Sequence, residues 1–116
     1  MSARLQIFGL KKCVDTRKAE RYFKERRIEF QRIELSEKGL SAGELRAVAA
    51  RTGLPALLDR EGARFRDLGL AHSALSDKQL EEKLLADPLL LRTPIVRKGP
   101  LATVGYVPDV WSTWEH

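Results

Sequence analysis

Hydrophobic and polar positions alternate along the first third of the chain in a way that predicts a strand, a helix and a second strand. Residues 4 to 8, RLQIF, form a short apolar run of the kind found in buried strands. Residues 29 to 35, EFQRIEL, return to a strand pattern. Between them, from about residue 13 to residue 26, apolar side chains recur with helical spacing, at Ala19, Tyr22 and Phe23. This order predicts a right-handed βαβ unit with parallel strands.

Two clear helix starts mark the middle of the chain. The segments LSAGEL and LSDKQL each place a serine, Ser41 or Ser76, three residues before Glu or Gln, with leucines on either side. This combination of a capping box and a hydrophobic staple predicts helices near residues 42 to 51 and 77 to 86. We expect one or two short helical turns between them.

The last quarter of the chain predicts a hairpin and a closing helix. The apolar runs Ile95 to Val96 and Leu101 to Gly105 flank a turn around Gly99, which indicates two antiparallel strands. A final helix is expected from Pro108, at the first helical position, to about Trp114. Its inward-facing side chains would be Val110, Trp111 and Trp114.

The complete order, βαβ followed by helices and then ββα, predicts an α/β fold of the thioredoxin-like (glutaredoxin-like) type. We expect a single domain over residues 1–116, with a helical insertion at about 37–90 between strand 2 and strand 3. In α/β sheets, ligands gather at the carboxyl ends of parallel strands. Cys13 follows the first strand and therefore lies at that edge.

The charge of the chain favours anionic small molecules over nucleic acid as ligands. There are 21 Lys and Arg against 16 Asp and Glu, for a net charge of +5. Both signs are mixed along the whole chain, whereas a nucleic-acid site concentrates cations on one surface. The densest cluster, KERRIEFQR, is typical of a solvated helix end. We therefore do not expect nucleic-acid binding.

Composition also restricts the redox chemistry and the location. A single cysteine excludes an internal disulfide, a cysteine-rich zinc site and an iron–sulfur cluster. The two histidines, His72 and His116, have no second ligand at metal spacing, so no metal site is expected. The N-terminal residues MSARLQIFG lack a secretory signal pattern, and no apolar run is long enough to cross a bilayer. We therefore expect a cytoplasmic protein without membrane partners.

Cys13 has two interpretations when its spacing alone is considered. As a nucleophile it would use the helix N-terminus and the nearby cations Lys11, Lys12 and Arg17 to favour the thiolate. Thr16, three residues on, could offer its hydroxyl to the sulfur or cap a backbone group. The free N–H groups and the cations would also bind an anion. As a structural residue, Cys13 would be a small buried hydrophobe, and spacing alone favours neither interpretation.

Several motifs resemble one known family across nearly the whole chain. The pattern C-x-x-[ST]-R is met by Cys13, Thr16 and Arg17, and the segments KAERYFKERRIEFQRIEL, LSDKQLEEKLLADPLLLRTPIV and VGYVPDVW follow. In these motifs the chain resembles the glutaredoxin-coupled arsenate reductases and their relatives, which include the transcriptional regulator Spx. The resemblance implies that Cys13 is the nucleophile, that Arg17 stabilises the anion, and that Thr16 supports the site.

The same resemblance predicts the residues opposite Cys13. It implies that Pro94 is cis and that Thr93 presents its backbone to a bound thiol. In arsenate reductases of this type an arginine precedes the proline, whereas here Arg92 stands one residue earlier and would face the other way. A second family arginine aligns with Asp59, next to Arg60, and a third aligns with Tyr106. These departures favour a thiol-linked substrate over arsenate.

Two functions are expected on these grounds, beside a third alternative in which the chain retains only the fold of the family. The first is an arsenate-reductase-like thiol oxidoreductase whose Cys13 is resolved by glutathione or glutaredoxin. Its substrate would be an oxyanion or a mixed disulfide, bound with help from Lys11, Lys12, Arg60, Arg92, Thr93 and Pro94. Glutathione would act as co-substrate, and no permanently bound cofactor is expected. The alternative is a regulatory or binding protein similar to Spx, with RNA polymerase as partner. Thr16 replaces the second cysteine of the Spx switch, which excludes an internal disulfide switch.

Overall fold

The predicted βαβ unit is present in the computed structural model, which describes residues 4–70 and 74–114. Strand β1 (Leu5–Gly9), helix α1 (Val14–Glu25) and strand β2 (Phe30–Glu34) follow one another. The two strands pair in parallel over all five residues of each, from Leu5 opposite Phe30 to Gly9 opposite Glu34. Helix α1 buries the apolar face expected from its spacing, together with Thr16. The parallel unit is therefore confirmed, with ends within a residue or two of those predicted.

The hairpin completes a four-stranded mixed sheet in the order β2-β1-β3-β4. Strand β3 (Ile95–Lys98) runs antiparallel to β1, and β4 (Leu101–Val104) runs antiparallel to β3. Gly99 adopts a positive φ of 57° in the turn between them, a conformation that glycine reaches without steric cost. This topology confirms the expected thioredoxin-like fold.

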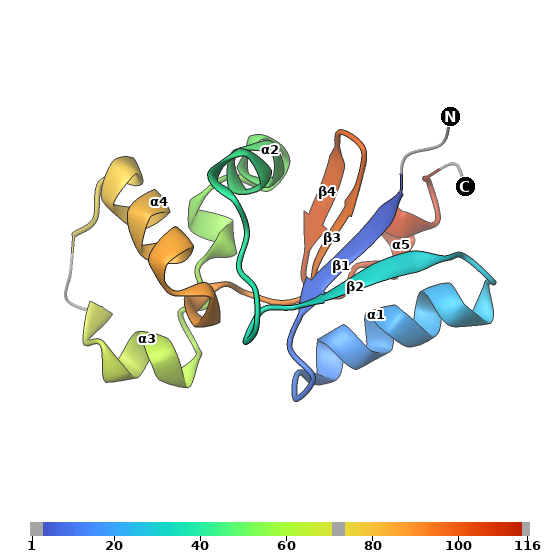
Figure 1. The fold of residues 1–116 in the computed structure, drawn as a ribbon, viewed down its shortest axis with the longest axis horizontal. Coiled ribbons are helices and arrows are strands. Elements are labelled where there is room, and N and C mark those ends of the chain that lie inside the picture. Colours follow the sequence, from blue (N-terminus) through green and yellow to red (C-terminus); the bar gives the residue numbers. More distant parts are fainter. Residues whose placement is uncertain (1–3, 71–73, 115–116) are drawn as a thin grey trace.

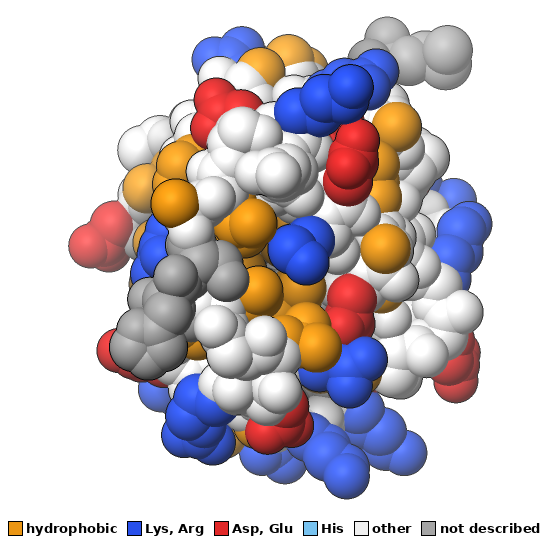
Figure 2. Space-filling view, turned by 90° about the vertical axis from the view of Figure 1, so that its left-hand side faces the viewer, with side chains coloured by type: hydrophobic (Ala, Val, Ile, Leu, Met, Phe, Trp, Pro, Cys, Tyr) orange, Lys and Arg blue, Asp and Glu red, His pale blue; other side chains and the backbone are white. Residues whose placement is uncertain are grey.

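A helical segment separates β2 from β3 along the chain and lies at one end of the long axis (Figure 1). Helices α2 (Ala42–Thr52) and α4 (Asp77–Ala86) both begin with the capping boxes expected from sequence. The shorter elements of this segment are η1 (Pro55–Leu57), α3 (Ala63–Asp67) and η3 (Pro88–Leu90). Viewed from this end, hydrophobic side chains show between Lys and Arg side chains (Figure 2). None of the helices in the described ranges is both long and apolar enough to cross a membrane.

The sheet divides the core into two clusters of buried side chains. One cluster packs the sheet against the helical segment and includes Phe8, Leu45, Val48, Leu84 and Ile95. The other packs the sheet against α1 and α5 (Pro108–Trp111) and includes Ile7, Phe23, Val96, Trp111 and Trp114. Because neighbouring strand residues point to opposite faces, Ile7 and Phe8 belong to different clusters.

The closing helix differs from the prediction in two respects. It begins at Pro108 as expected, and Trp111 and Trp114 are buried. However, α5 ends at Trp111, and the side chain of Val110 is 43% exposed, so the prediction that Val110 packs inward is wrong. The indole of Trp111 is fully buried, as predicted, and its N–H donates to Thr103 Oγ1 over 2.8 Å.

Candidate functional site

Cys13 is the N-cap residue of α1, at the point where the loop after β1 enters the helix. Its backbone is extended, with φ −78° and ψ 121°. Its N–H donates to the Leu10 carbonyl over 2.9 Å, and its carbonyl accepts from the Arg17 N–H over 3.2 Å. The thiol is only partly exposed. The loop thus holds the sulfur at the helix N-terminus, where the helix dipole favours negative charge.

Thr93 and Pro94 lie opposite this thiol, although they are 80 residues away in sequence. The Thr93–Pro94 peptide bond is cis, as expected. The Thr93 hydroxyl donates to Cys13 Sγ over 3.1 Å, and the Thr93 carbonyl oxygen lies 3.9 Å from the same sulfur. The residue expected to contact a bound thiol through its backbone also touches the sulfur through its side chain.

Thr16 is fully buried beneath the cysteine loop. Its Oγ1 accepts a hydrogen bond of 3.4 Å from the Leu10 N–H, and its side chain also hydrogen-bonds the Cys13 thiol. Gly9 leaves the space for it, because a Cβ at Gly9 would lie 2.5 Å from Thr16 Oγ1. Thr16 therefore supports both the sulfur and the backbone of the loop.

The electrostatic balance around Cys13 favours the thiolate. Partial burial raises the pKa of the Cys13 thiol, because burial disfavours the charged form. Hydrogen bonds from the Thr16 and Thr93 hydroxyls, and from the backbone N–H groups of Thr16 and Asp15, act in the opposite direction. Together they outweigh the effect of burial and lower the pKa of Cys13 below its ordinary value.

The expected cations lie in two groups. Lys11, Lys12 and Arg17 surround the thiol in sequence, and their side chains are exposed to solvent. Arg60 and Arg92 line one pocket next to the helical segment, together with Asp59. The Arg92 guanidinium lies over Gly105, 3.2 Å from where a Cβ would be. In the described part of the chain, none of these cations hydrogen-bonds the sulfur, whose hydrogen-bond partners are threonines and backbone groups.

The end of β2 supplies a support that the sequence analysis missed. Glu34 Oε1 accepts 2.9 Å and 3.0 Å hydrogen bonds from the Lys11 N–H and from Arg32 Nη2, and Glu34 Oε2 accepts from Ser36. Arg32 Nη1 donates to the Gly9 carbonyl over 3.3 Å. Arg32 Nε also lies 2.9 Å from a carboxylate oxygen of Glu20, an ion pair without hydrogen-bond alignment. Arg32 and Glu34 therefore tie β2 to both ends of the turn before Cys13.

The carboxyl group of Glu34 is held in its charged form by these contacts. Slight burial raises its pKa, but hydrogen bonds from Ser36, Arg32 and the Lys11 N–H, and the positive charge of Arg32, lower the pKa below its ordinary value. The only sequence signal for this clamp was the placement of Arg32 and Glu34 two residues apart, on one face of a strand. Their partner, the backbone of the cysteine loop, is visible only in the folded chain.

The described residues contain no group of three side chains able to ligate a metal. His72 and His116, considered in the sequence analysis, lie outside the described residues. The site is therefore built from one thiol, two hydroxyls, backbone N–H groups and cations.

The chain is similar in sequence and in structure to several known proteins. The chain is 28% identical to the uncharacterized protein YusI of Bacillus subtilis over 90% of this chain and 92% of YusI. It is 28% identical to the global transcriptional regulator Spx 2 of Oceanobacillus iheyensis over 90% of this chain and 78% of that protein. The solved structure of an arsenate reductase from Vibrio cholerae superposes with a TM-score of 0.81, at 25% identity, over 95% of this chain and 96% of that one.

The family model agrees with these relatives. The model of the ArsC family matches residues 8–114, from the end of β1 to the last described residue. The match includes Cys13, the Thr93–Pro94 bond and most residues of both core clusters. The chain therefore belongs to the ArsC family.

Proposed function

We propose that the protein is a thiol oxidoreductase that uses Cys13 as its single nucleophile and a glutathione mixed disulfide as its substrate. The observation that carries this proposal is the 3.1 Å hydrogen bond from the Thr93 hydroxyl to Cys13 Sγ, at the N-terminus of α1. A thiolate is the attacking form of cysteine, and donors aimed at the sulfur increase its fraction. A cysteine that served only as a buried hydrophobe would need none of these donors.

The reaction proceeds by two thiol–disulfide exchanges. The Cys13 thiolate attacks the glutathione sulfur of a mixed disulfide, forms a Cys13–glutathione disulfide and releases the substrate thiolate. A second glutathione thiolate then attacks the glutathione sulfur bound to Cys13, which forms glutathione disulfide and regenerates the Cys13 thiolate. The sulfur of the incoming glutathione is oxidised to the disulfide level and one substrate sulfur is reduced to a thiol, while the first glutathione sulfur stays at the disulfide level throughout. Because the chain has one cysteine, the second thiol must come from glutathione or a glutaredoxin.

The residues around the sulfur would have distinct roles in this sequence. Thr93 and Thr16 donate to the Cys13 thiolate, and the backbone at Thr93–Pro94 would align the incoming disulfide. Lys11, Lys12 and Arg17 would stabilise the negative charge that moves between the sulfurs. Arg60 and Arg92 share a pocket that would hold a carboxylate or an oxyanion of the substrate.

The mixed disulfide is favoured over arsenate because of the residue before the proline. A threonine at that position donates one neutral hydrogen bond, whereas arsenate binding at the sulfur would benefit from a guanidinium in direct contact. Arg92, one residue earlier, lies over Gly105 instead.

The test compares the wild-type protein with Cys13→Ser. Each is assayed with a glutathionylated peptide and with arsenate, in the presence of glutathione, with and without a glutaredoxin. We expect turnover of the glutathionylated peptide by the wild type only, and much slower turnover of arsenate. Turnover that persists in Cys13→Ser would contradict the mechanism, and faster turnover of arsenate would contradict the assigned substrate.

A second candidate function is a regulatory protein that binds a partner without turnover. Its support is the similarity to the regulator Spx 2 over most of the chain. The partner proposed for this candidate is RNA polymerase. Capture of purified RNA polymerase by both the wild type and Cys13→Ser, together with no reductase turnover, would favour it over the enzyme.

A further inference from the structure

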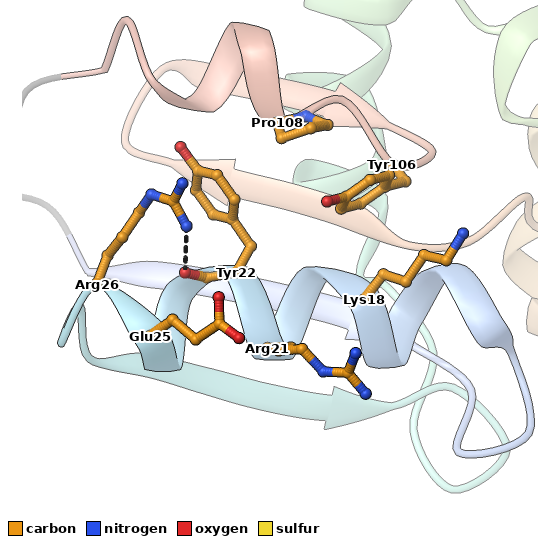
Figure 3. A pocket seen from close by; sticks show the side chains of 7 residues that line it. All are labelled: Lys18, Arg21, Tyr22, Glu25, Arg26, Tyr106 and Pro108. Atoms are coloured by element: carbon orange, nitrogen blue, oxygen red, sulfur yellow. Dashed lines mark hydrogen bonds between the residues drawn. The ribbon is translucent and has the colours of Figure 1, made fainter.

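A groove runs along α1 and beneath the segment that links β4 to α5, beside the candidate site (Figure 3). Its cavity measures about 500 Å³ and is lined by Lys18, Arg21, Tyr22, Glu25, Arg26 and Tyr106, with Pro108 at its edge. The five residues from α1 are spaced three or four apart or adjacent, so they share one helical face. They lie on the side of α1 that faces α5, and the sequence analysis assigned them no function beyond core packing and helix pairing.

The groove carries an excess of unpaired positive charge. It contains three cations and one carboxylate, which leaves a formal charge of +2. The ion pairs in the described ranges use Arg32, Arg46 and Arg64, and no groove cation takes part in them. A groove lined by more cations than carboxylates favours binding of an anionic group.

Tyrosine rings hold two of these cations in place. The Arg26 guanidinium lies 3.7 Å from the centre of the Tyr22 ring and donates to the Tyr22 carbonyl over 3.1 Å (Figure 3). Lys18 Nζ lies 5.7 Å from the centre of the Tyr106 ring (Figure 3). The Tyr106 side chain remains 39% exposed. Such cation–π contacts order long side chains before a ligand arrives.

One end of the groove adjoins the reactive sulfur. Tyr106 follows Gly105, whose N–H donates to the Pro94 carbonyl over 2.8 Å, and Thr93 before it touches Cys13 Sγ. On α1, Lys18 is five residues beyond Cys13, which corresponds to about 7.5 Å along the helix axis. A partner whose sulfur meets Cys13 would therefore extend over Lys18 and Tyr106.

We propose that this groove docks an acidic segment of the protein that exchanges disulfides with Cys13. The proposal rests on the proposed function, because it names the partner of the same site. From Lys18 to Arg26 the helix spans about 12 Å, which matches about four residues of an extended peptide. Arg and Tyr are also the residues most enriched at protein interfaces.

Glu25 favours a polypeptide over nucleic acid as the occupant. Its carboxylate lines the groove among the cations and would repel a continuous row of phosphates. An acidic segment that includes one donor, such as a lysine or a free N–H group, can satisfy Glu25 and the cations together. The arrangement of charges thus matches a mixed, mainly acidic peptide.

The test measures docking apart from the chemistry of Cys13. The probe is an acetylated and amidated octapeptide of alternating Glu and Ala, with a peptide in which Gln replaces Glu as its control. Binding is followed by tryptophan fluorescence, because the Trp111 ring contacts Tyr22 and Tyr106 at centroid distances of 5.3 Å and 5.6 Å. We expect saturable binding of the Glu peptide only, weakened by added salt.

Matched variants locate the binding. The double variant Lys18→Gln/Arg21→Gln should weaken binding of the Glu peptide about fivefold or more, because two cation–carboxylate contacts with the peptide are lost. Lys24→Gln/Lys78→Gln removes the same charge at exposed positions outside the groove and should leave binding within about twofold. In the turnover assay with the glutathionylated peptide, the groove variant should retain wild-type activity when free glutathione is the only reductant. Failure of Cys13-dependent turnover would thus contradict the proposed function without affecting the docking result.

Three outcomes would overturn the docking proposal. The first is the absence of saturable binding of the Glu peptide at millimolar concentration. The second is equal loss of binding in the groove variant and in the control variant. The third is tighter binding of a single-stranded dT oligonucleotide that displaces the peptide, which would identify the groove as a nucleic-acid site.

Discussion

The Cys13 thiol lies between two threonine hydroxyls that come from distant parts of the chain. Thr16 is fixed by its place in the first turn of α1 and by its burial, whereas Thr93 reaches the sulfur from the start of the hairpin. Each donates to the sulfur, and the backbone adds two further donors. Among the single residues around the sulfur, hydrogen-bond donors and not the nearby cations account for the lowered pKa of Cys13.

Replacing Thr93 by valine tests this dependence. Valine keeps the shape of the side chain but removes the hydroxyl that donates to Cys13 Sγ. Because the lowered pKa makes the thiolate available at lower pH, loss of a donor moves the pH profile of Cys13 alkylation to higher pH. A hydrogen bond worth about 1 kcal/mol corresponds to about a fivefold slower reaction with iodoacetamide below the midpoint. An unchanged profile would show that Thr93 does not stabilise the thiolate.

Replacing Gly9 by alanine tests the packing beneath the loop. The added Cβ would lie 2.5 Å from Thr16 Cγ2, so either Thr16 or β1 must shift. We expect a loss of about 1–3 kcal/mol in the free energy of unfolding, measured with urea. The additional change Thr16→Ala should recover part of that loss. As a control, Gly43→Ala in α2 meets no atom within 4 Å, and it should leave stability unchanged or slightly higher.

At the scale of elements, the carboxyl end of β2 holds the cysteine loop in place. The Leu35 N–H and Arg32 Nη1 both donate to the Gly9 carbonyl, and Glu34 accepts from the Lys11 N–H. The loop is therefore tied to the neighbouring strand on one side and to α1 on the other. This explains how a loop with exposed lysines keeps a defined conformation next to the thiol.

Replacing Glu34 by alanine should loosen that loop. The Lys11 N–H would lose its acceptor, so its hydrogen exchange should become faster by about tenfold, while exchange in α2 stays unchanged. Because the pKa of Glu34 is lowered in the folded chain, its contribution is present above its unfolded pKa and lost as pH falls through its folded pKa. In the wild type, the Lys11 N–H should therefore lose protection against hydrogen exchange at acidic pH. Glu29→Ala, an exposed position just before β2, is the control.

In the molecule as a whole, the sheet separates two clusters of buried side chains, and each cluster positions a different part of the candidate site. The cluster with Phe23 and Trp111 seats α1, and with it the cysteine loop and the cationic groove. The cluster with Leu84 and Val48 seats the helical segment that carries Arg60. Damage to one cluster should thus affect one side of the site.

Paired core substitutions test the independence of the two clusters. Leu84→Ala should cost about 2–5 kcal/mol and Phe23→Leu about 1 kcal/mol, because each leaves a cavity in a fully buried position. As the two side chains lie on opposite faces of the sheet, the double variant should equal the sum within about 0.5 kcal/mol. Thermal or urea unfolding gives these values. A larger coupling would mean that the sheet transmits strain between the clusters.

Local chemistry explains why most of the fold could be predicted. The capping boxes at Ser41 and Ser76, the spacing in α1 and the proline that opens α5 act over a few residues each, and all are present as expected. Val110 was assigned wrongly because Trp111 and Trp114 occupy the buried side of this short segment, and Val110, one position before Trp111, stays exposed. The supports at Arg32 and Glu34 were missed because their partners are backbone groups of another element.

The order of elements, the position of Cys13 at the start of a helix and the exclusion of an internal disulfide all follow from the sequence, since each depends on local pattern or on composition. What surrounds the sulfur follows from the tertiary structure alone. The folded chain brings the Thr93 hydroxyl to the thiol and places Arg92 and Arg60 along the same separate pocket. It also places the Lys18 ammonium near the Tyr106 ring. These contacts join residues many positions apart, and they exist only because the sheet sets β1 beside β3 and α1 beside α5.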